Sequence, residues 1–220
     1  MPQADSRLAT TKADAAYLEI RRQIIEGRLP PGAVLDQGEV ARSLQISTTP
    51  VREALRRLEM EDLVVMSAHR DARVAPLSGK TLKELYELRL VLDPLAAELT
   101  ADRASDPEID AICKLAEHHP RSQARQAAAN RRFHRAIYSA CGNSVLIATL
   151  DSLWDRSDRY RLRLLGSPEE VTVASHEHSE IAGALRSRNA KLVARLVREH
   201  IEGSIAKIDS LAQTNENSHS

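Results

Sequence analysis

The sequence lacks the features that would place it in a membrane or among secreted proteins. No apolar run approaches the roughly 18 residues of a membrane span, and the polar start MPQADSRLATTK does not resemble a signal peptide. Two cysteines, Cys113 and Cys141, are too few for a disulfide framework, and no Cys-x-x-Cys pair suggests a structural zinc. We therefore expect a soluble protein of the cytoplasm with no membrane partner.

The sequence also lacks net charge, because 31 Lys and Arg balance 31 Asp and Glu among 220 residues. Taken alone, this balance argues against nucleic acid as a partner, since proteins that bind it usually carry a basic excess. The local composition differs, because residues 42–58 contain four arginines and a single acidic residue. This segment could present a basic surface although the whole chain is neutral.

The chain changes character near residue 77. Before this point short apolar segments are separated by turns, and after it the apolar spacing is helical almost throughout. The length is sufficient for two small domains, each with a buried core. In a fold that is mainly α-helical, we predict a flexible arm at 1–12, a first domain at 13–76, a second domain at 77–212 and a disordered tail at 213–220.

The first domain has the pattern of three short helices followed by a β-hairpin. Helical spacing precedes Gly27, the triplet Pro30-Pro31-Gly32 indicates a turn, and two further helical stretches follow at 38–45 and 47–60. The β-prone runs LVVM and ARVA, separated by SAHRD, then predict a small hairpin. Together these elements predict a winged helix-turn-helix, whose second motif helix, 47–60, enters the major groove of DNA.

The start of this recognition helix carries residue types that contact DNA. Hydroxyls and free N–H groups at a helix N-terminus suit phosphate oxygens, and an arginine one turn later can bind a guanine edge with two hydrogen bonds. Ser47 is the expected N-cap. The candidate DNA contacts in this helix are Ser47, Thr48, Thr49 and Arg52.

Four other arginines of the first domain are weighed beside these candidates. Arg42 adds to the local basic charge, and Arg70 at the hairpin tip could enter a minor groove or contact phosphate. A merely solvated side chain is the alternative for a residue at the tip. Arg56 and Arg57 have the pattern of an ordinary solvated helix face, which we favour for them.

From residue 79 onward the apolar spacing is helical, and no credible strand is present. Short connections between the segments favour an antiparallel bundle of about six helices. The expected helices are 81–104, with a local bend at Pro94, and then 106–117, 121–141, 144–165, 168–187 and 189–212.

Histidines in the second domain could converge on one point. Asn130 and His134 are four residues apart on one helix and therefore share a face. His178 and His200 lie in two later apolar helical segments, and bundle cores build metal sites from such inward side chains. Spacing alone leaves the alternative open that each is an ordinary surface or core histidine.

The first domain resembles the amino-terminal module of the GntR family of bacterial transcription regulators. The match runs through PGAVLDQGEVARSLQISTTPVREALRRLEMEDLVVMSAHRDARVAPL and is most specific in the core STTPVREAL. Three positions depart from the family pattern: Thr48 replaces a usual Arg, Asp71 replaces the usual wing-tip Gly, and Gly38 replaces a frequent phosphate-contacting residue. The resemblance implies binding to double-stranded operator DNA.

The second domain resembles the all-helical FCD ligand-binding domain of the FadR-type branch of that family. Four segments match in order, namely ELYELRLVLDPLAAELTA, NRRFHRAIYSACGN, EHSEIAGALRSRN and VREHI. In relatives that bind metal, an Asp and three His take the places of Asn130, His134, His178 and His200. The resemblance implies that these four residues hold a divalent ion, with zinc the first expectation and nickel or manganese the alternatives. The amide of Asn130 can coordinate a metal but brings no charge.

Such a metal site would favour a carboxylate ligand. Three neutral imidazoles leave coordination positions open, and the excess positive charge attracts an acid. The family places an inward Arg at the position of Arg89, which could bind the same acid; the alternative is a surface side chain lying over Leu85 and Leu92. Arg159 and Arg163, in the stretch WDRSDRYRLR, are further candidates to contact the acid.

These observations predict a homodimeric transcriptional regulator whose operator affinity is controlled by a small organic acid, and the family resemblance implies that it is a repressor. Two copies are expected because one recognition helix reads few base pairs and twofold symmetry provides two half-sites. The competing function is a metal-dependent hydrolase, but its nearest candidate base, Glu177, points about 100° away from His178 around their helix. A third possibility is a metal-free domain whose histidines bind the acid directly.

Overall fold

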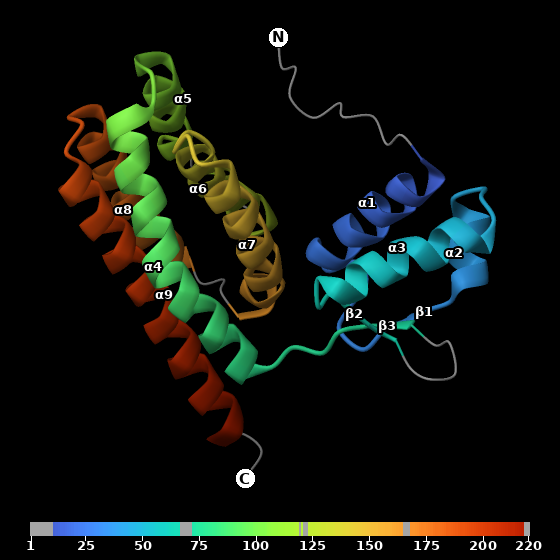
Figure 1. Cartoon of the computed structure of the whole chain (residues 1–220). Helices are drawn as coiled ribbons and strands as arrows, with labels where there is room; N and C mark the ends of the chain where they lie inside the picture. The colour runs from blue at the N-terminus through green and yellow to red at the C-terminus, as the bar shows by residue number, and fades with distance from the viewer. Residues whose placement is uncertain (1–10, 67–71, 119, 121–122, 165–167, 218–220) are drawn as a thin grey trace. The chain divides into compact units, whose positions relative to one another are not determined.

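The computed structural model describes most of the chain and divides it into two compact units, Met1–Leu77 and Ser78–Ser220. Its described residues form nine helices and three short strands (Figure 1). No helix among them is both long and apolar enough to cross a bilayer. The residues described are 11–66, 72–118, 120, 123–164 and 168–217.

The first unit packs three helices on a three-stranded antiparallel sheet. Its helices are α1 (Lys12–Ile25), α2 (Gln37–Ser43) and α3 (Thr48–Met60). Its strands are β1 (Val34–Leu35), β2 (Val64–Met66) and β3 (Ala72–Val74), in the spatial order β1-β3-β2. The buried stripes of α1 and α3 meet in one core, which includes Ile20, Ile24, Val51, Leu55 and Leu58. The predicted winged helix-turn-helix fold is confirmed.

Strand β1 is an element that we did not predict, because the sequence indicated only a turn there. Gly32, with φ of 80°, ends the turn, and its N–H donates to the Val74 carbonyl at 2.9 Å. The Val74 N–H donates in turn to the Ala33 carbonyl at 2.9 Å, which brings the next two residues alongside β3. Two residues are too few to show the alternating pattern by which a strand is recognised.

The turn between α2 and α3 fixes where the recognition helix begins. Gln45 has the left-handed φ of 54°, and the Ile46 N–H donates to the Ala41 carbonyl at 3.0 Å. This bonding closes the end of α2 in the manner of a Schellman motif. The chain then re-enters a helix at Ser47, which has the extended conformation of an N-cap residue.

The second unit is a bundle of six helices, as predicted. They are α4 (Gly79–Arg103), α5 (Asp106–Ala116), α6 (Gln123–Ser139), α7 (Ser144–Leu164), α8 (Pro168–Arg186) and α9 (Ala190–Asn217). Helix α4 continues through Pro94 and packs against α9, α7 and α6. Its inward face is unusual because it buries Arg89 and Asp93 among apolar residues.

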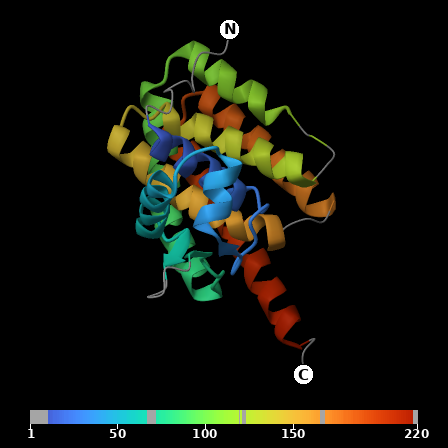
Figure 2. The same cartoon turned by 90° about the vertical axis from the view of Figure 1, so that its right-hand side faces the viewer.

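Helix α9 is longer than the sequence indicated. We expected it to end at residue 212 with a tail beyond, whereas residues 213–217 continue the helix. Figures 1 and 2 both show the C-terminal part of α9 extending past the other helices of its bundle. No Gly or Pro follows Gly203 within this helix, so no residue that usually terminates a helix interrupts its polar end.

Candidate DNA-binding face and histidine site

The start of α3 presents polar side chains to solvent. Ser47, Thr48, Thr49 and Arg52 are all exposed, while Val51 and the following apolar stripe of α3 are buried. The Ser47 hydroxyl makes no capping hydrogen bond to its own helix. These hydroxyls and the arginine are therefore available for phosphate or base contacts at the N-terminal end of the helix.

The other candidate DNA contacts have different positions. Arg42 on α2 is exposed, and its guanidinium lies 3.9 Å from the Glu39 carboxylate, which is a weak surface pair. Arg70 lies outside the described residues. Arg56 on α3 is exposed, as expected of a solvated helix face.

Arg57 connects α3 to α1 and is not an ordinary solvated residue. Its NH1 atom donates to Asp14 Oδ1 at 2.7 Å, and its guanidinium carbon lies 4.1 Å from the centre of the Tyr17 ring. The Tyr17 hydroxyl donates to Glu61 Oε1 at 2.6 Å, and burial together with this bond raises the pKa of Tyr17 to about 12. The contacts to Asp14 and Tyr17 give Arg57 a role within the fold.

Three histidines from three helices meet in the core of the second unit. They are His134 on α6, His178 on α8 and His200 on α9, all less than a tenth exposed. One ring nitrogen from each lies within 4.8 Å of the others, and the Nε2 atoms of His134 and His200 are 3.1 Å apart. Two nitrogens bound tetrahedrally to one metal at about 2.0–2.1 Å would be roughly 3.3 Å apart, so the spacing of this donor set fits a metal ion.

Asn130 lies one helical turn before His134, as its spacing predicted. It is buried, at 7% exposure, and neither its amide oxygen nor its amide nitrogen has a hydrogen-bond partner in the described part of the chain. Leaving both polar atoms unsatisfied is costly, and such groups usually mark a missing ligand, ion or water. Asn130 is therefore suited to bind whatever occupies the site beside His134.

Glu177 approaches the cluster through His200. Its Oε2 atom lies 2.6 Å from Nδ1 of His200, and its side chain is 31% exposed at the edge of the cluster. Its angle from His178 on α8, which sequence spacing does provide, gives no sign of this contact. The partner is on α9, so recognising it required the packing of two helices that sequence spacing does not provide.

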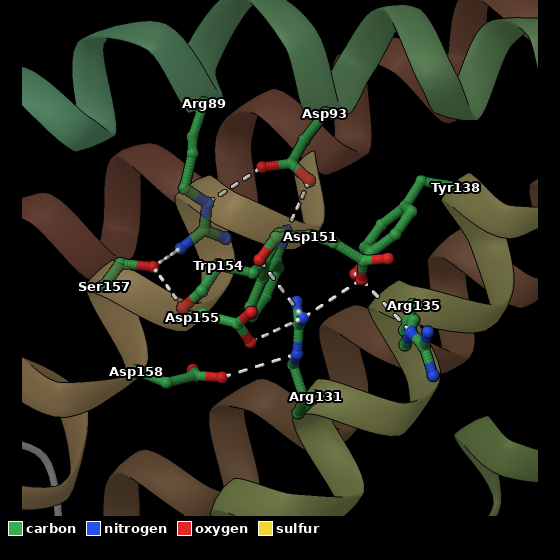
Figure 3. A network of polar contacts seen from close by, with 10 residues as sticks. All are labelled: Arg89, Asp93, Arg131, Arg135, Tyr138, Asp151, Trp154, Asp155, Ser157 and Asp158. Atoms are coloured by element: carbon green, nitrogen blue, oxygen red, sulfur yellow. Dashed lines mark hydrogen bonds and ion pairs between the residues drawn. The ribbon is translucent and has the colours of Figure 1, made fainter. Parts of the chain in front are cut away.

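Arg89 is buried, which excludes the surface alternative considered for it. Its Nε donates to Asp93 Oδ2 at 2.9 Å, and its NH1 donates to the Ser157 hydroxyl at 3.0 Å (Figure 3). Burial opposes the charge of Arg89, but Asp93 together with Tyr86 and Asp158 outweighs this effect, and the pKa of Arg89 is raised. Arg89 is thus a fixed cation inside the bundle.

Trp154 on α7 contacts both the buried cation and the histidine cluster. The Arg89 guanidinium carbon lies 3.6 Å from the centre of a Trp154 ring, and the His134 ring centre lies 4.9 Å from Trp154. Its indole Nε1 donates to Asp93 Oδ1 at 2.8 Å. No sequence pattern distinguishes this residue as part of the site, although it is the only tryptophan of the chain.

A second cation, Arg131 on α6, faces a row of aspartates on α7 (Figure 3). Its NH2 atom lies 3.2 Å from Asp151 Oδ1 and 3.1 Å from Asp155 Oδ1, and its Nε lies 3.6 Å from Asp158 Oδ2. The three acids are spaced at i, i+4 and i+7, which places them on one helix face. Arg131 therefore joins α6 to the aspartate-bearing face of α7.

The remaining two arginine candidates belong to α7. Arg159 is buried at 8% exposure, and burial lowers its pKa because a charged guanidinium loses solvation there. Arg163 lies in the last turn of α7, and its side chain lies outside the described part of the structure.

Comparisons with known proteins agree with this architecture. Residues 12–74 match the family described as bacterial regulatory proteins, gntR family, and residues 84–203 match the FCD domain. The Nta operon transcriptional regulator of Aminobacter aminovorans is 30% identical over 78% of this chain and 82% of its own. The probable D-xylose utilization operon transcriptional repressor of Paenarthrobacter nicotinovorans is 30% identical over 87% of this chain and 86% of its own.

A solved structure supports the fold. The protein McbR/YncC of E. coli superimposes with a TM-score of 0.79 at 23% identity, covering 94% of this chain and 99% of that one. Both the DNA-binding unit and the helical unit are therefore matched in one known architecture. The chain belongs to the GntR family of bacterial regulatory proteins and carries an FCD domain C-terminal to its winged helix-turn-helix.

Proposed function

We propose that this transcriptional regulator is a cytoplasmic homodimeric repressor that leaves its operator when a small organic acid binds the FCD domain. Repression is supported by relatives named as repressors, among them the D-xylose operon protein and the gluconate operon repressor of Bacillus subtilis. The observation that carries the acid-binding part is the buried set of His134, His178 and His200 with the unsatisfied Asn130 beside it.

These four residues would hold a divalent metal ion. Zinc is the first expectation for a set of imidazoles, with nickel or manganese as alternatives, and the Asn130 amide oxygen could complete or support the set. A bound ion would supply a positive charge and open positions for a carboxylate. Because three imidazoles and an amide carry no charge, the attraction for an anionic ligand would not be weakened by the donors themselves.

The arginines would bind the remainder of the acid. Arg89 approaches the histidine cluster through Trp154, which both Arg89 and His134 contact. Arg159 and Arg163 on the same helix as Trp154 are the further candidates. For repression to be relieved, the acid must bind the free and operator-bound states unequally, and a coupling of about 1–3 kcal/mol would change operator affinity about 5- to 150-fold.

A metal-dependent hydrolase is less well supported. Its general base would have to reach a water at the metal, whereas the carboxylate of Glu177 already contacts His200 Nδ1. The relatives are also named as transcriptional regulators. A metal-free domain, in which the histidines bind the acid directly, is distinguished by metal analysis of protein purified without chelator or nickel resin.

The test is a gel-shift titration of full-length protein on an operator selected from random duplex DNA. We expect short mono- or dicarboxylates, with zinc present, to release DNA from the unsubstituted protein and not from His134→Ala. His176→Ala is the matched control, because His176 is exposed on α8 and lies 3.6 Å from Glu180. The proposal fails if no acid alters operator binding, with or without metal. Sedimentation of the complex tests whether two copies bind one operator.

A further inference from the structure

We propose that Glu177 is a positioning residue of the histidine site, which orients His200 toward the metal and balances part of the metal charge. The inference rests on the proposed function, because it assumes that the site holds an ion. Neither the spacing of the histidines nor the family resemblance assigned a role to this residue. The contacts of both ring nitrogens of His200 carry the argument.

The two ring nitrogens of His200 face different partners. Nδ1 lies 2.6 Å from Glu177 Oε2, and Nε2 lies 3.1 Å from Nε2 of His134. An ionised carboxylate only accepts hydrogen bonds, so the neutral imidazole must carry its proton on Nδ1. The lone pair is then on Nε2, the nitrogen that points toward the other histidines. Glu177 thus selects the tautomer in which Nε2, facing the other histidines, can bind a metal.

The Glu177 carboxylate also lies partly in contact with water. The three histidines are less than a tenth exposed, whereas the Glu177 side chain is 31% exposed at the edge of the cluster. A carboxylate in contact with water incurs a smaller desolvation penalty than a fully buried acid. The donors carry no charge of their own, so Glu177 would supply a negative charge that Asn130 lacks.

A purely structural role, joining α8 to α9, is the competing explanation for this contact. Two substitutions separate the roles. Glu177→Gln keeps an oxygen that can accept the Nδ1 hydrogen bond but removes the charge, whereas Glu177→Ala removes both. Glu180→Gln is the control, since Glu180 lies on the same helix and its side chain is 51% exposed.

The experiment measures Zn²⁺ affinity of the full-length protein by competition with a chromophoric chelator. We expect Glu177→Ala to bind Zn²⁺ about 10- to 100-fold more weakly, as for other carboxylates that support a ligating histidine, and Glu177→Gln to lose less. Glu180→Gln should bind as the unsubstituted protein does. Thermal unfolding of the metal-free variants identifies any that fail to fold. If Glu177→Ala fails to fold, the Zn²⁺ affinity of Glu177→Gln tests the inference.

A second measurement addresses positioning directly. Nitrogen-15 NMR of the zinc-loaded protein should show His200 protonated on Nδ1, and Glu177→Ala should lose the defined signal of that proton while Glu177→Gln retains it. Zinc binding left unchanged in Glu177→Ala would overturn this inference alone. Absence of zinc binding by the unsubstituted protein would overturn the metal part of the proposed function and this inference with it.

Discussion

The indole Nε1 of Trp154 donates a hydrogen bond of 2.8 Å to Oδ1 of Asp93, inside the helical bundle. The other carboxylate oxygen of Asp93 accepts from Arg89 Nε, so Asp93 accepts hydrogen bonds from both Trp154 and Arg89. The Trp154 ring also lies against His134, so one side chain contacts both the histidine cluster and the buried ion pair. Trp154 therefore contacts Asp93, Arg89 and His134.

Replacing Trp154 by Phe should destabilise the protein. The substitution removes the donor to Asp93 Oδ1, and leaving a buried acceptor unsatisfied costs about 1–3 kcal/mol. Urea unfolding followed by circular dichroism measures the loss, since this variant has no tryptophan fluorescence. An unchanged free energy of unfolding would mean that the Asp93 contact contributes nothing.

Arg89→Met should destabilise the fold by about 3–5 kcal/mol, because it leaves the carboxylate of Asp93 buried without its cation. Adding Asp93→Asn should recover most of this loss, since Asn removes the charge while its amide oxygen can still accept from Trp154. The free energy of unfolding of the single and double variants checks both expectations.

The double variant also tests Arg89 as an acid ligand. If Arg89 contacts the acid, the folded Arg89→Met, Asp93→Asn protein should still bind the operator. The acid that releases the unsubstituted protein from the operator should then have no effect on it. Normal release would show that Arg89 serves only the fold.

Much of this site was predictable because it depends on spacing within one helix. Asn130 and His134 are four residues apart and share a face, whereas spacing alone left a surface position open for His178 and His200 and the family resemblance indicated that they join the site. Arg89 and Asp93 have the same spacing of four, so their pairing on α4 was also within reach of the sequence.

The contacts that sequence could not provide join different helices. Glu177 meets His200 across α8 and α9, and the choice among its possible partners depends on how far the two helices slide and rotate against each other. The same holds for Arg57, whose pattern on α3 suggested a solvated face until the packing of α1 placed Asp14 beside it. Charge patterns describe one helix at a time, whereas ion pairs of this kind depend on two.

Arg52→Ala should weaken operator binding without weakening the fold. Arg52 is exposed near the start of α3, and loss of a two-bond contact to a base costs about 1–3 kcal/mol, or about 5- to 150-fold in Kd. Gel shifts on the selected operator and on unrelated DNA check whether the loss is specific.

Arg57→Ala should instead lower the free energy of unfolding by about 0.2–1 kcal/mol, because its pair with Asp14 is partly exposed. A similar loss of operator binding in both variants would contradict the assignment.

Asp151 should make the stability of the helical unit dependent on acid pH. Burial would raise the pKa of Asp151, but hydrogen bonds from Tyr138 at 2.6 Å and Arg135 at 3.1 Å outweigh it, and its pKa is lowered. A carboxyl group with a lower pKa in the folded state stabilises the fold above its unfolded value, about 3.9, and this contribution is lost as pH falls through the folded value.

Asp151→Asn should therefore reduce the urea midpoint at about pH 7, and the difference from the unsubstituted protein should shrink as pH falls below about 4. The amide is nearly isosteric and can still accept from Tyr138, so the measurement isolates the charge. Asp102→Asn, at an exposed position on α4, is the control and should show no such trend. A difference that stays constant with pH would mean that the substitution acts through packing, since only the ionised form of Asp151 is favoured by Arg131 and Arg135.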